Sequence, residues 1–497
     1  MVLFLRQDKR LGKKHFFLTG VLWALLSAAQ LLAVWIRLGW ADGNEYLAVH
    51  WPALLGTFFI YALVFYAGGM YEPPMQRRKV AFDFLPLTTA GMAAILTGLV
   101  FYTRPDGQIG RGIWGLAALF TLALSYVYRR IHVALIRRGR FRRRAVILCE
   151  NPAQLAAMED LLGRANIPLY HVLGRVQTGE GDAADAGYSA SCPLLGTAAQ
   201  LEEVVRERNV DAVLVAGDGG WNRETLPALR RLRFDGVGIL DYMALSETLL
   251  NEIPLSHIDE QWLMTSALNS NIVHVRHLKR AMDVAVSLVG LVPGLPLMGL
   301  AALLIKLTSK GPVIYKQTRV GRGNKPYVLY KLRTMRVDAE SGGAVWARSH
   351  DSRVTPVGKY LRNWRLDEIP QLFNILKGEM SLVGPRPERP EFTGELARRI
   401  PFYNERHLVQ PGLTGWAQVC HPYGASVEAA ARKLQYDLYY IKNMNLLLDI
   451  AILLRTFRTI CAGLVHEEDV KEAEKNEYFE RTLGLREDGD GKEKGEP

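Results

Sequence analysis

The chain has 497 residues and carries 61 Lys and Arg against 50 Asp and Glu, which gives a formal net charge of +11. Hydrophobic residues make up 49% and charged residues 22%, and this balance excludes a disordered or a collagen-like chain. The length predicts about three domains. The cysteines lie far apart without a CxxC pair, so neither a disulfide framework nor a zinc site is indicated: Cys149, Cys192, Cys420 and Cys461.

The amino-terminal part, residues 1–135, is predicted to form four membrane-spanning helices. Residues 16–36 carry no charge, and at about 1.5 Å per residue they are long enough to cross a hydrocarbon layer of about 30 Å. Further apolar runs follow at about 51–70, 84–103 and 112–128. Because these runs follow the first one, a cleaved signal peptide is the weaker interpretation of residues 16–36.

Basic residues flank these runs on one side of the predicted membrane. Lys and Arg gather before the first run, between the second and third, and in an arginine run after the fourth, whereas the loops near 39–50 and 104–111 are poor in them. The positive-inside rule then predicts that the amino terminus and the chain after residue 129 lie in the cytoplasm. Beside a span, the arginine run suits lipid headgroups, so membrane lipids are expected partners and nucleic acid is not.

Residues 144–265 show the alternation that is typical of a Rossmann-like α/β domain. Short β-branched runs at 145–149, 171–176, 211–217 and 237–241 alternate with amphipathic stretches at 152–164, 198–209 and 224–236, which predicts a parallel sheet covered by helices. A dinucleotide-binding version would carry G-x-G-x-x-G after its first strand. The turn here is Cys149-Glu150-Asn151-Pro152, so the domain is expected to hold no cofactor and to be structural, regulatory or self-associating.

An uncharged run at 284–305 is long enough to cross a membrane but is predicted to enter it and return. Basic residues lie on both sides of the run, so both of its ends favour the cytoplasm. Pro293 and Pro296 lie in the middle, where a break in the helical hydrogen-bond ladder permits a bend. We therefore expect a re-entrant helix over 281–307 that is broken at these prolines; an ordinary proline-kinked span is the alternative.

The candidate chemistry follows in the strings YKLRTM (330–335), LDEIPQLFNILKGEMSLVGPRPE (366–388) and PGLTGWAQV (411–419). Asp367 and Glu368 precede a proline, which is tolerated in the first turn of a helix, so both carboxylates are predicted at a helix start. Arg386 between two prolines suits bidentate recognition of phosphate. Further candidates for phosphate contact are Lys331, Arg333, Arg353 and Arg365. The plainer alternatives are a helix-capping carboxylate pair and a solvated strand edge.

These strings, in this order, resemble those of the bacterial sugar transferases called polyprenyl-phosphate glycosyl-1-phosphate transferases. The four spans and the α/β domain ahead of them are similar to the large subgroup that initiates exopolysaccharide synthesis. The resemblance implies an α/β catalytic domain over 271–470, carrying the re-entrant helix, on the cytoplasmic face of the bacterial inner (cytoplasmic) membrane. It also implies that the enzyme is a multi-pass membrane protein, and a homo-oligomer is compatible with it.

The resemblance further implies the reaction and its partners. Asp367 would attack a UDP-sugar and bind Mg²⁺, Glu368 would assist with the metal or the acceptor phosphate, and uridine monophosphate (UMP) would leave. Polyprenyl (undecaprenyl) phosphate would then take the sugar phosphate from an aspartyl-phosphosugar intermediate. The sequence does not identify the sugar.

The chain departs from the family pattern at two places. Family members break the re-entrant helix at a Ser-Pro pair, where this chain has Leu295-Pro296. They also often follow W-A-Q-V with an asparagine-glycine-arginine run whose arginine meets a phosphate, whereas this chain has Cys420-His421-Pro422. His421 is a candidate replacement for that arginine.

Two other functions are alternatives to the transferase. A membrane-bound nucleotide-sugar dehydratase would also join four spans to an α/β domain, but the glycine fingerprint is missing. A non-catalytic scaffold of polysaccharide assembly would not need the Asp-Glu pair and the Gly-Pro-Arg-Pro string. The amphipathic run 434–460 fits a membrane-surface helix or a core helix, and residues 483–497 are predicted to be disordered.

Overall fold

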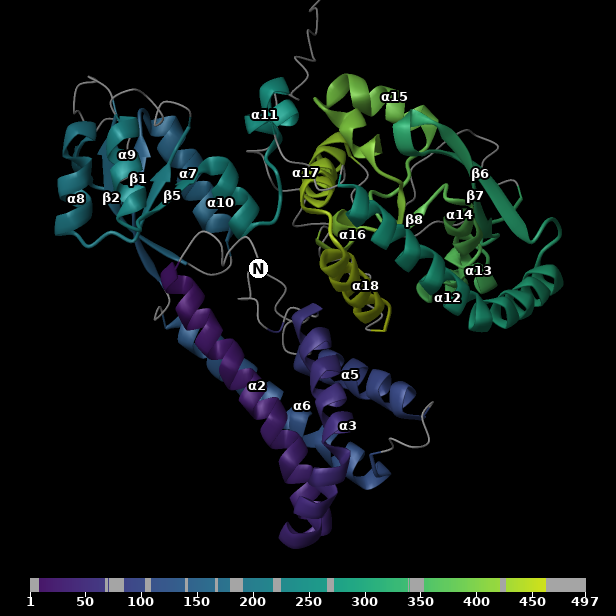
Figure 1. The fold of residues 1–497 in the computed structure, drawn as a ribbon. Coiled ribbons are helices and arrows are strands. Elements are labelled where there is room, and N and C mark those ends of the chain that lie inside the picture. The colour runs from purple at the N-terminus through teal and green to yellow at the C-terminus, as the bar shows by residue number, and fades with distance from the viewer. Residues whose placement is uncertain are drawn as a thin grey trace, which may run out of the picture. The chain divides into compact units, whose positions relative to one another are not determined.

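The computed structural model describes residues 9–67, 70, 85–102, 109–138, 142–165, 169–178, 191–217, 225–265, 272–337, 339, 353–420 and 426–461. The chain divides into two compact units, and the boundary between them lies between Asn251 and Glu252. Figure 1 shows their helices and strands.

Four apolar helices form the amino-terminal part, as predicted. They are α2 (Lys9–Leu38), α3 (Trp40–Ala67), α5 (Leu85–Tyr102) and α6 (Arg111–Arg137). By length and composition α2, α3 and α6 can each span a membrane, whereas α5 has a shorter apolar stretch, Thr89–Val100. The indole Nε1 of Trp114 on α6 donates to Thr97 Oγ1 on α5 at 3.1 Å, so the two helices are also joined by a polar contact.

The loop expected at residues 39–50 is wrong, because almost all of it is helix. Only Gly39, with φ of 81°, separates α2 from α3. The polar residues of this segment lie in the first turns of α3, which include Asp42. A carboxylate near a helix amino terminus interacts favourably with the helix dipole, so a polar start does not prevent a helix.

The middle of the chain forms the predicted parallel sheet. Its strands are β1 (Arg143–Cys149), β2 (Tyr170–Gln177), β3 (Leu194–Thr197), β4 (Ala212–Val215) and β5 (Gly238–Asp241), in the order β3-β2-β1-β4-β5. All four neighbouring pairs are parallel. The edge strand β3 was not predicted, because four residues that include a glycine give little alternation to recognise.

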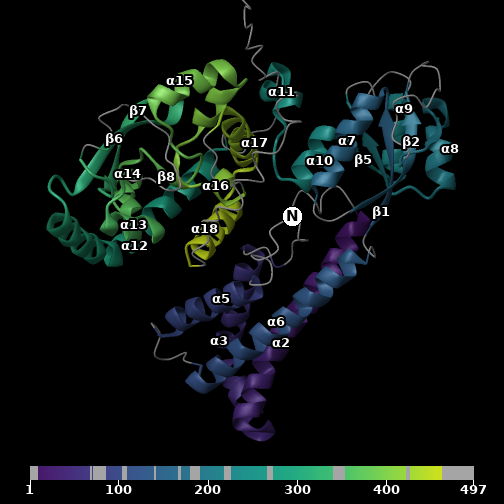
Figure 2. The ribbon, with the colours of Figure 1, turned by 180° about the vertical axis from the view of Figure 1, so that it is seen from behind.

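Helices cover both faces of this sheet. One face packs against α7 (Pro152–Arg164) and α10 (Tyr242–Leu249), and the other packs against α8 (Leu201–Glu207) and α9 (Thr225–Phe234). Figure 2 shows the same arrangement from behind. At the turn after β1, Asn151 Oδ1 accepts from Gln154 N at 2.9 Å and Gln154 Oε1 accepts from Glu150 N at 2.9 Å. The backbone N–H groups of Glu150 and Gln154 are therefore hydrogen-bonded to side chains of the same turn.

The second unit begins at Glu252, ahead of the boundary expected at residue 271. Ile253 N donates to Gln435 O at 3.1 Å, which ties the segment before α11 (Glu260–Thr265) to the second unit. The unit also contains an antiparallel hairpin, β6 (Ile314–Val320) with β7 (Pro326–Leu332). A parallel pair joins β8 (Ser381–Val383) to β9 (Gly412–Thr414). Its α-helices besides α11 and α12 (Val273–Thr308) are α13 (Pro356–Asn363), α14 (Gln371–Lys377), α15 (Pro390–Arg399), α16 (Trp416–Cys420), α17 (Val427–Asn443) and α18 (Leu446–Cys461). The run 434–460 is therefore two helices, and α17 is largely buried.

The apolar segment is one long helix, α12 (Val273–Thr308), which continues through Pro293 and Pro296 rather than ending at them. Its ribbon bends part-way along (Figures 1 and 2). Buried residues recur along its length on one face: Ser287, Leu291, Gly294, Ala301 and Ile305. The other face exposes large apolar side chains, including Val289, Val292 and Leu300. The re-entrant path itself stays a prediction.

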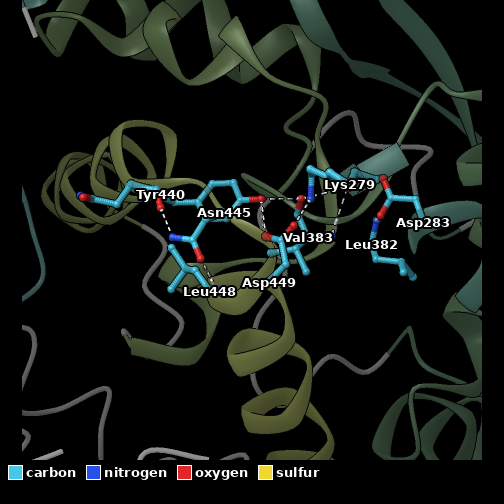
Figure 3. A network of polar contacts seen from close by, with 10 residues as sticks. Lys279, Asp283, Leu382, Val383, Tyr440, Asn445, Leu448 and Asp449 are labelled. Carbon is cyan, nitrogen blue, oxygen red and sulfur yellow. Dashed lines mark hydrogen bonds and ion pairs between the residues drawn. The ribbon is translucent and has the colours of Figure 1, made fainter. Parts of the chain in front are cut away.

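One turn near the start of α12 connects three other elements of the second unit. Lys279 Nζ lies 2.8 Å from Asp449 Oδ2 on α18, and Asp283 Oδ1 accepts from Leu382 N on β8 at 3.0 Å (Figure 3). Arg280 donates to the last carbonyls of α14, those of Ile375 at 2.6 Å and Leu376 at 2.7 Å. The string K-R-x-x-D therefore anchors α12 to α14, β8 and α18.

Candidate active site

Asp367 and Glu368 lie in a short 3-10 turn, Leu366–Glu368, between α13 and α14. The preceding Arg365 is left-handed, with φ of 55°. A non-glycine residue pays about 1–3 kcal/mol for a sparsely populated conformation, which persists where the surroundings hold it. Both carboxylates are buried, at 6% exposed for Asp367 and 7% for Glu368. The pair lies just before a helix, as predicted, but is withdrawn from solvent.

Three cations surround one oxygen of Glu368. Its Oε1 lies 3.1 Å from Lys331 Nζ, 3.3 Å from Arg386 Nη2 and 3.7 Å from Arg365 Nη1. Burial alone would raise the pKa of Glu368, but Lys331, Arg386 and Arg365 together hold that pKa well below its ordinary value. Glu368 is therefore ionised and neutralised by residues from β7, from the turn and from the loop after β8.

Asp367 has a different environment from its neighbour. Its Oδ1 finds no hydrogen-bond partner among the described residues. Burial, and next the negative charge of Glu368, raise the pKa of Asp367, while Lys331, Arg362 and Arg365 oppose the rise. A carboxylate that is buried and lacks a hydrogen bond is more basic and less solvated than an exposed one. This is the chemical character of a nucleophile.

The loop with Arg386 and the PGLTGW string cross at very close range. Gly384 N donates to Thr414 O and Gly412 N donates to Pro385 O, both at 2.9 Å. A Cβ on Gly384, Gly412 or Gly415 would overlap main-chain atoms of the opposite segment. The glycines of the two strings are therefore required by the crossing, and PGLTGW supports the loop that carries Arg386.

The structure brings together only some of the predicted phosphate contacts. Lys331, Arg365 and Arg386 meet at Glu368, whereas Arg333 donates to the main chain where α12 ends, at Lys310 O (2.6 Å) and Ser309 O (3.0 Å). Arg353 donates to Ala339 O at 2.9 Å. His421 and the tail 483–497 lie outside the described residues.

Two polar residues of α14 were missed by sequence reasoning. Asn374 is fully buried and bonds β7 twice, to Tyr330 N at 3.1 Å and Val328 O at 2.7 Å, which places the strand of Lys331 beside α14. Gln371 is 3% exposed, and its Nε2 has no hydrogen-bond partner in the described part of the chain. A signal was present for Asn374, since it interrupts the apolar run of α14, whereas Gln371 is the first residue of that helix.

The described residues contain no group of three or more His, Cys, Asp and Glu side chains that could hold a metal ion. Mg²⁺ is commonly held by one or two carboxylates together with substrate phosphates. Oδ1 of Asp367 suits that mode of binding, because it is a hard oxygen ligand and has no hydrogen-bond partner in the described part of the chain.

Comparison with known proteins shows the family of this chain. Residues 274–463 match the family model for bacterial sugar transferases. A relative from Komagataeibacter xylinus, named undecaprenyl-phosphate glucose phosphotransferase, is 31% identical over 411 residues, which cover 78% of this chain and 72% of the relative. The chain belongs to the bacterial sugar transferase family. Of the functions considered from the sequence, the transferase agrees with this membership.

Other relatives of this sugar transferase cover less of the chain. A UDP-N-acetylgalactosamine-undecaprenyl-phosphate N-acetylgalactosaminephosphotransferase from Aeromonas hydrophila is 44% identical over 245 residues, which span 49% of the chain but only 56% of the relative. A putative undecaprenyl-phosphate N-acetylgalactosaminyl 1-phosphate transferase from Bacillus subtilis is 48% identical over 146 residues, 29% of the chain and 82% of the relative. Residues 76–239 match a family model described as a CoA-binding domain.

The glycine crossing yields a stability prediction. Gly384→Ala should lower the thermal unfolding midpoint in detergent, because overpacking of this kind costs about 1–3 kcal/mol or more. Gly394→Ala is the matched control: Gly394 is exposed within α15 and nothing lies within 4 Å of an added Cβ. It should raise stability by about 0.5–1 kcal/mol. Equal midpoints for the two variants would contradict the crossing.

Proposed function

We propose that this chain transfers a sugar 1-phosphate from a UDP-sugar to polyprenyl (undecaprenyl) phosphate, releases UMP and so initiates a glycan such as an exopolysaccharide. The observation that carries the proposal is the buried, unpartnered oxygen of Asp367 beside a carboxylate that gathers three cations. The names of the relatives, which include UDP-glucose:undecaprenyl-phosphate glucose-1-phosphate transferases, support the same donor and acceptor.

The proposed reaction has two displacements at one phosphorus. An oxygen of the Asp367 carboxylate attacks the β-phosphorus of the UDP-sugar, and the bond from that phosphorus to the bridging oxygen breaks. UMP leaves with the electron pair, and an aspartyl-phosphosugar remains. A phosphate oxygen of polyprenyl phosphate then attacks the same phosphorus, and the carboxylate of Asp367 is restored. One diphosphate linkage is broken and one is formed, so no other energy source is needed.

The cations around Glu368 suit the charge that this reaction handles. Lys331, Arg365 and Arg386 lie within 3.7 Å of one carboxylate oxygen, so their charges already converge on one point. A diphosphate placed there would share these cations with Glu368. Preorganised cations stabilise developing phosphate charge without reorganisation during the reaction. Glu368 then serves as the carboxylate that gathers the cations.

The metal we propose is Mg²⁺, with Asp367 as its protein ligand. When bound, the ion would neutralise part of the charge on the diphosphate. The protein atoms that fit it are the Asp367 oxygens, together with phosphate oxygens of the donor.

We also propose that α12 is re-entrant and that the second unit lies on the cytoplasmic face of the bacterial inner membrane. Lys279 and Asp283 near its start contact α18 and β8, while Ala301 and Ile305 near its end pack with Leu332 of β7. At about 1.5 Å per residue, a straight crossing would place these ends on opposite sides of a layer about 30 Å thick. Contact of both ends with one unit favours a helix that returns.

The first prediction from this proposal concerns the nucleophile. Asp367→Asn should abolish UMP release from membranes supplied with Mg²⁺, polyprenyl phosphate and a UDP-sugar, because the amide keeps the shape but is not an anionic nucleophile. The protein should remain folded and membrane-inserted. Asp235→Asn, at an exposed carboxylate of the first unit, is the control and should release UMP normally. Near-normal release by Asp367→Asn would exclude the proposed mechanism.

The second prediction concerns the metal. Excess chelator should stop UMP release, and added Mg²⁺ should restore it, because the donor diphosphate carries more charge than the cations beside Glu368 neutralise while they also pair with that carboxylate. The measurement is UMP release before and after dialysis against chelator. Undiminished release in chelator would show that no divalent cation is required.

The third prediction concerns topology. Lys310 is exposed directly after α12, so Lys310→Cys in a background without native cysteines should react with an impermeant thiol reagent only after the membrane is opened. Trp40→Cys, at the junction of α2 and α3, should react in intact cells. Labelling of position 310 in intact cells would refute the re-entrant path. The catalytic proposal would fail with it, since UDP-sugars are cytoplasmic.

A further inference from the structure

The loop that carries Arg386 is held at four consecutive main-chain carbonyls, each by a different donor. Prolines on both sides of Arg386 fix φ as well. The loop's path is thus set by its neighbours in space. The pairs are Gly412 N with Pro385 O at 2.9 Å, Arg406 Nη2 with Arg386 O at 3.1 Å, Arg319 Nη1 with Pro387 O at 3.0 Å and Val320 N with Glu388 O at 3.0 Å.

Arg406 is the donor that holds Arg386 itself. It is 4% exposed, and its Nη2 reaches both Arg386 O at 3.1 Å and Asp437 Oδ2 at 2.9 Å. Its Nη1 donates to Tyr403 Oη at 2.7 Å. Because Asp437 lies on α17, the guanidinium of Arg406 joins that helix to the loop.

Burying an arginine is unfavourable unless its N–H groups are paired, and a hydrophobic pair can often fill the same space at no loss of stability. Stability alone therefore does not explain why Arg406 and Asp437 are buried as an ion pair. A hydrophobic side chain could not donate to the carbonyl of Arg386. The side chain of Arg386 is also held, because its Nη2 lies 3.3 Å from Glu368 Oε1. Both the main chain and the guanidinium of Arg386 are therefore fixed.

We propose that Arg406 is a positioning residue that places the Arg386 guanidinium for the donor diphosphate. The inference rests on the proposed function, in which Arg386 contacts a phosphate of the UDP-sugar. Arg406 does not touch the substrate; it fixes the main chain from which the side chain of Arg386 extends toward Glu368. Without it, Arg386 gains other rotamers and binds the diphosphate more weakly. A purely structural brace would instead affect stability and leave diphosphate affinity unchanged.

Two Arg406 variants separate these roles. Arg406→Met with Asp437→Leu removes the donor and its buried partner together. The other carboxylate near Arg406, Glu388 Oε1 at 3.8 Å from Arg406 Nη1, belongs to a side chain that is 25% exposed and keeps access to water. Arg406→Lys keeps the charge, but one ammonium does not span the partners that the two arms of a guanidinium reach. Lys279→Met with Asp449→Leu is the matched control, because it removes another buried ion pair of the same unit, with side chains 9% and 0% exposed.

The measurement is equilibrium binding of UDP, with Mg²⁺, to the purified full-length protein in nanodiscs. UDP carries the diphosphate that all UDP-sugars share, so the unknown sugar does not matter. Both Arg406 variants should raise the Kd for UDP about tenfold, the size expected for loss of one well-placed charged hydrogen bond. The control pair should leave the Kd within about twofold of the wild type.

An Arg386→Met background decides whether Arg406 acts through Arg386. Adding Arg406→Met and Asp437→Leu to it should not raise the Kd further, because residues that act through one contact are not additive. A further rise, or a normal Kd in whichever Arg406 variant folds, would overturn the positioning role. Failure of the wild type to bind UDP would overturn this role and the proposed donor together. UDP binding without UMP release from a UDP-sugar would overturn only the proposed reaction.

Discussion

Two adjacent carboxylates removed from water are the constraint on which the candidate site depends. A buried carboxylate is tolerated when cations and hydrogen bonds compensate for its lost hydration. Glu368 meets this condition by drawing Lys331, Arg365 and Arg386 to one oxygen, and so brings together β7, the turn before α14 and the loop after β8. Asp367 is less well compensated, because its Oδ1 has no hydrogen-bond partner among the described residues and burial still raises its pKa. The two neighbouring carboxylates therefore differ in their environment.

Other residues of the second unit hold β7, the turn before α14 and the loop after β8 in place. Asn374 bonds α14 to the strand of Lys331, and Arg280 bonds the end of α14 to α12. The glycines that cross at Gly384 and Gly412 allow the main chain of PGLTGW to support the Arg386 loop directly. Many residues of these sequence strings therefore position the few charged groups around Asp367 and Glu368.

The long helix α12 has two chemically different faces along its length. Its inner face includes Gly294, where an added Cβ would lie 3.1 Å from Ile369, the residue after the carboxylate pair. Its outer face is apolar, as at Val292 and Leu300. An apolar face of this kind is stable against lipid and unfavourable against water. The catalytic candidates thus lie beside the segment that is expected to enter the membrane.

The local sequence pattern was enough to predict those features that depend only on residues close together in the sequence. The four apolar helices, the parallel sheet of the first unit and the carboxylates before α14 each follow from hydrophobic period or from a proline position. The loop expected at 39–50 failed because polar residues are compatible with a helix start, and β3 was too short to show a period.

The sequence by itself determined which segments are apolar, which are helical and where carboxylates and basic residues are concentrated. Only the tertiary structure decided the partner of each basic side chain. Lys331 and Arg333 share the alternation expected of one strand, yet β7 ends at Leu332. Lys331 reaches Glu368, while Arg333 is bonded to the main chain at the end of α12. The reason is physical: a long cationic side chain binds whichever acceptor the fold brings near, and that acceptor comes from a segment distant in sequence.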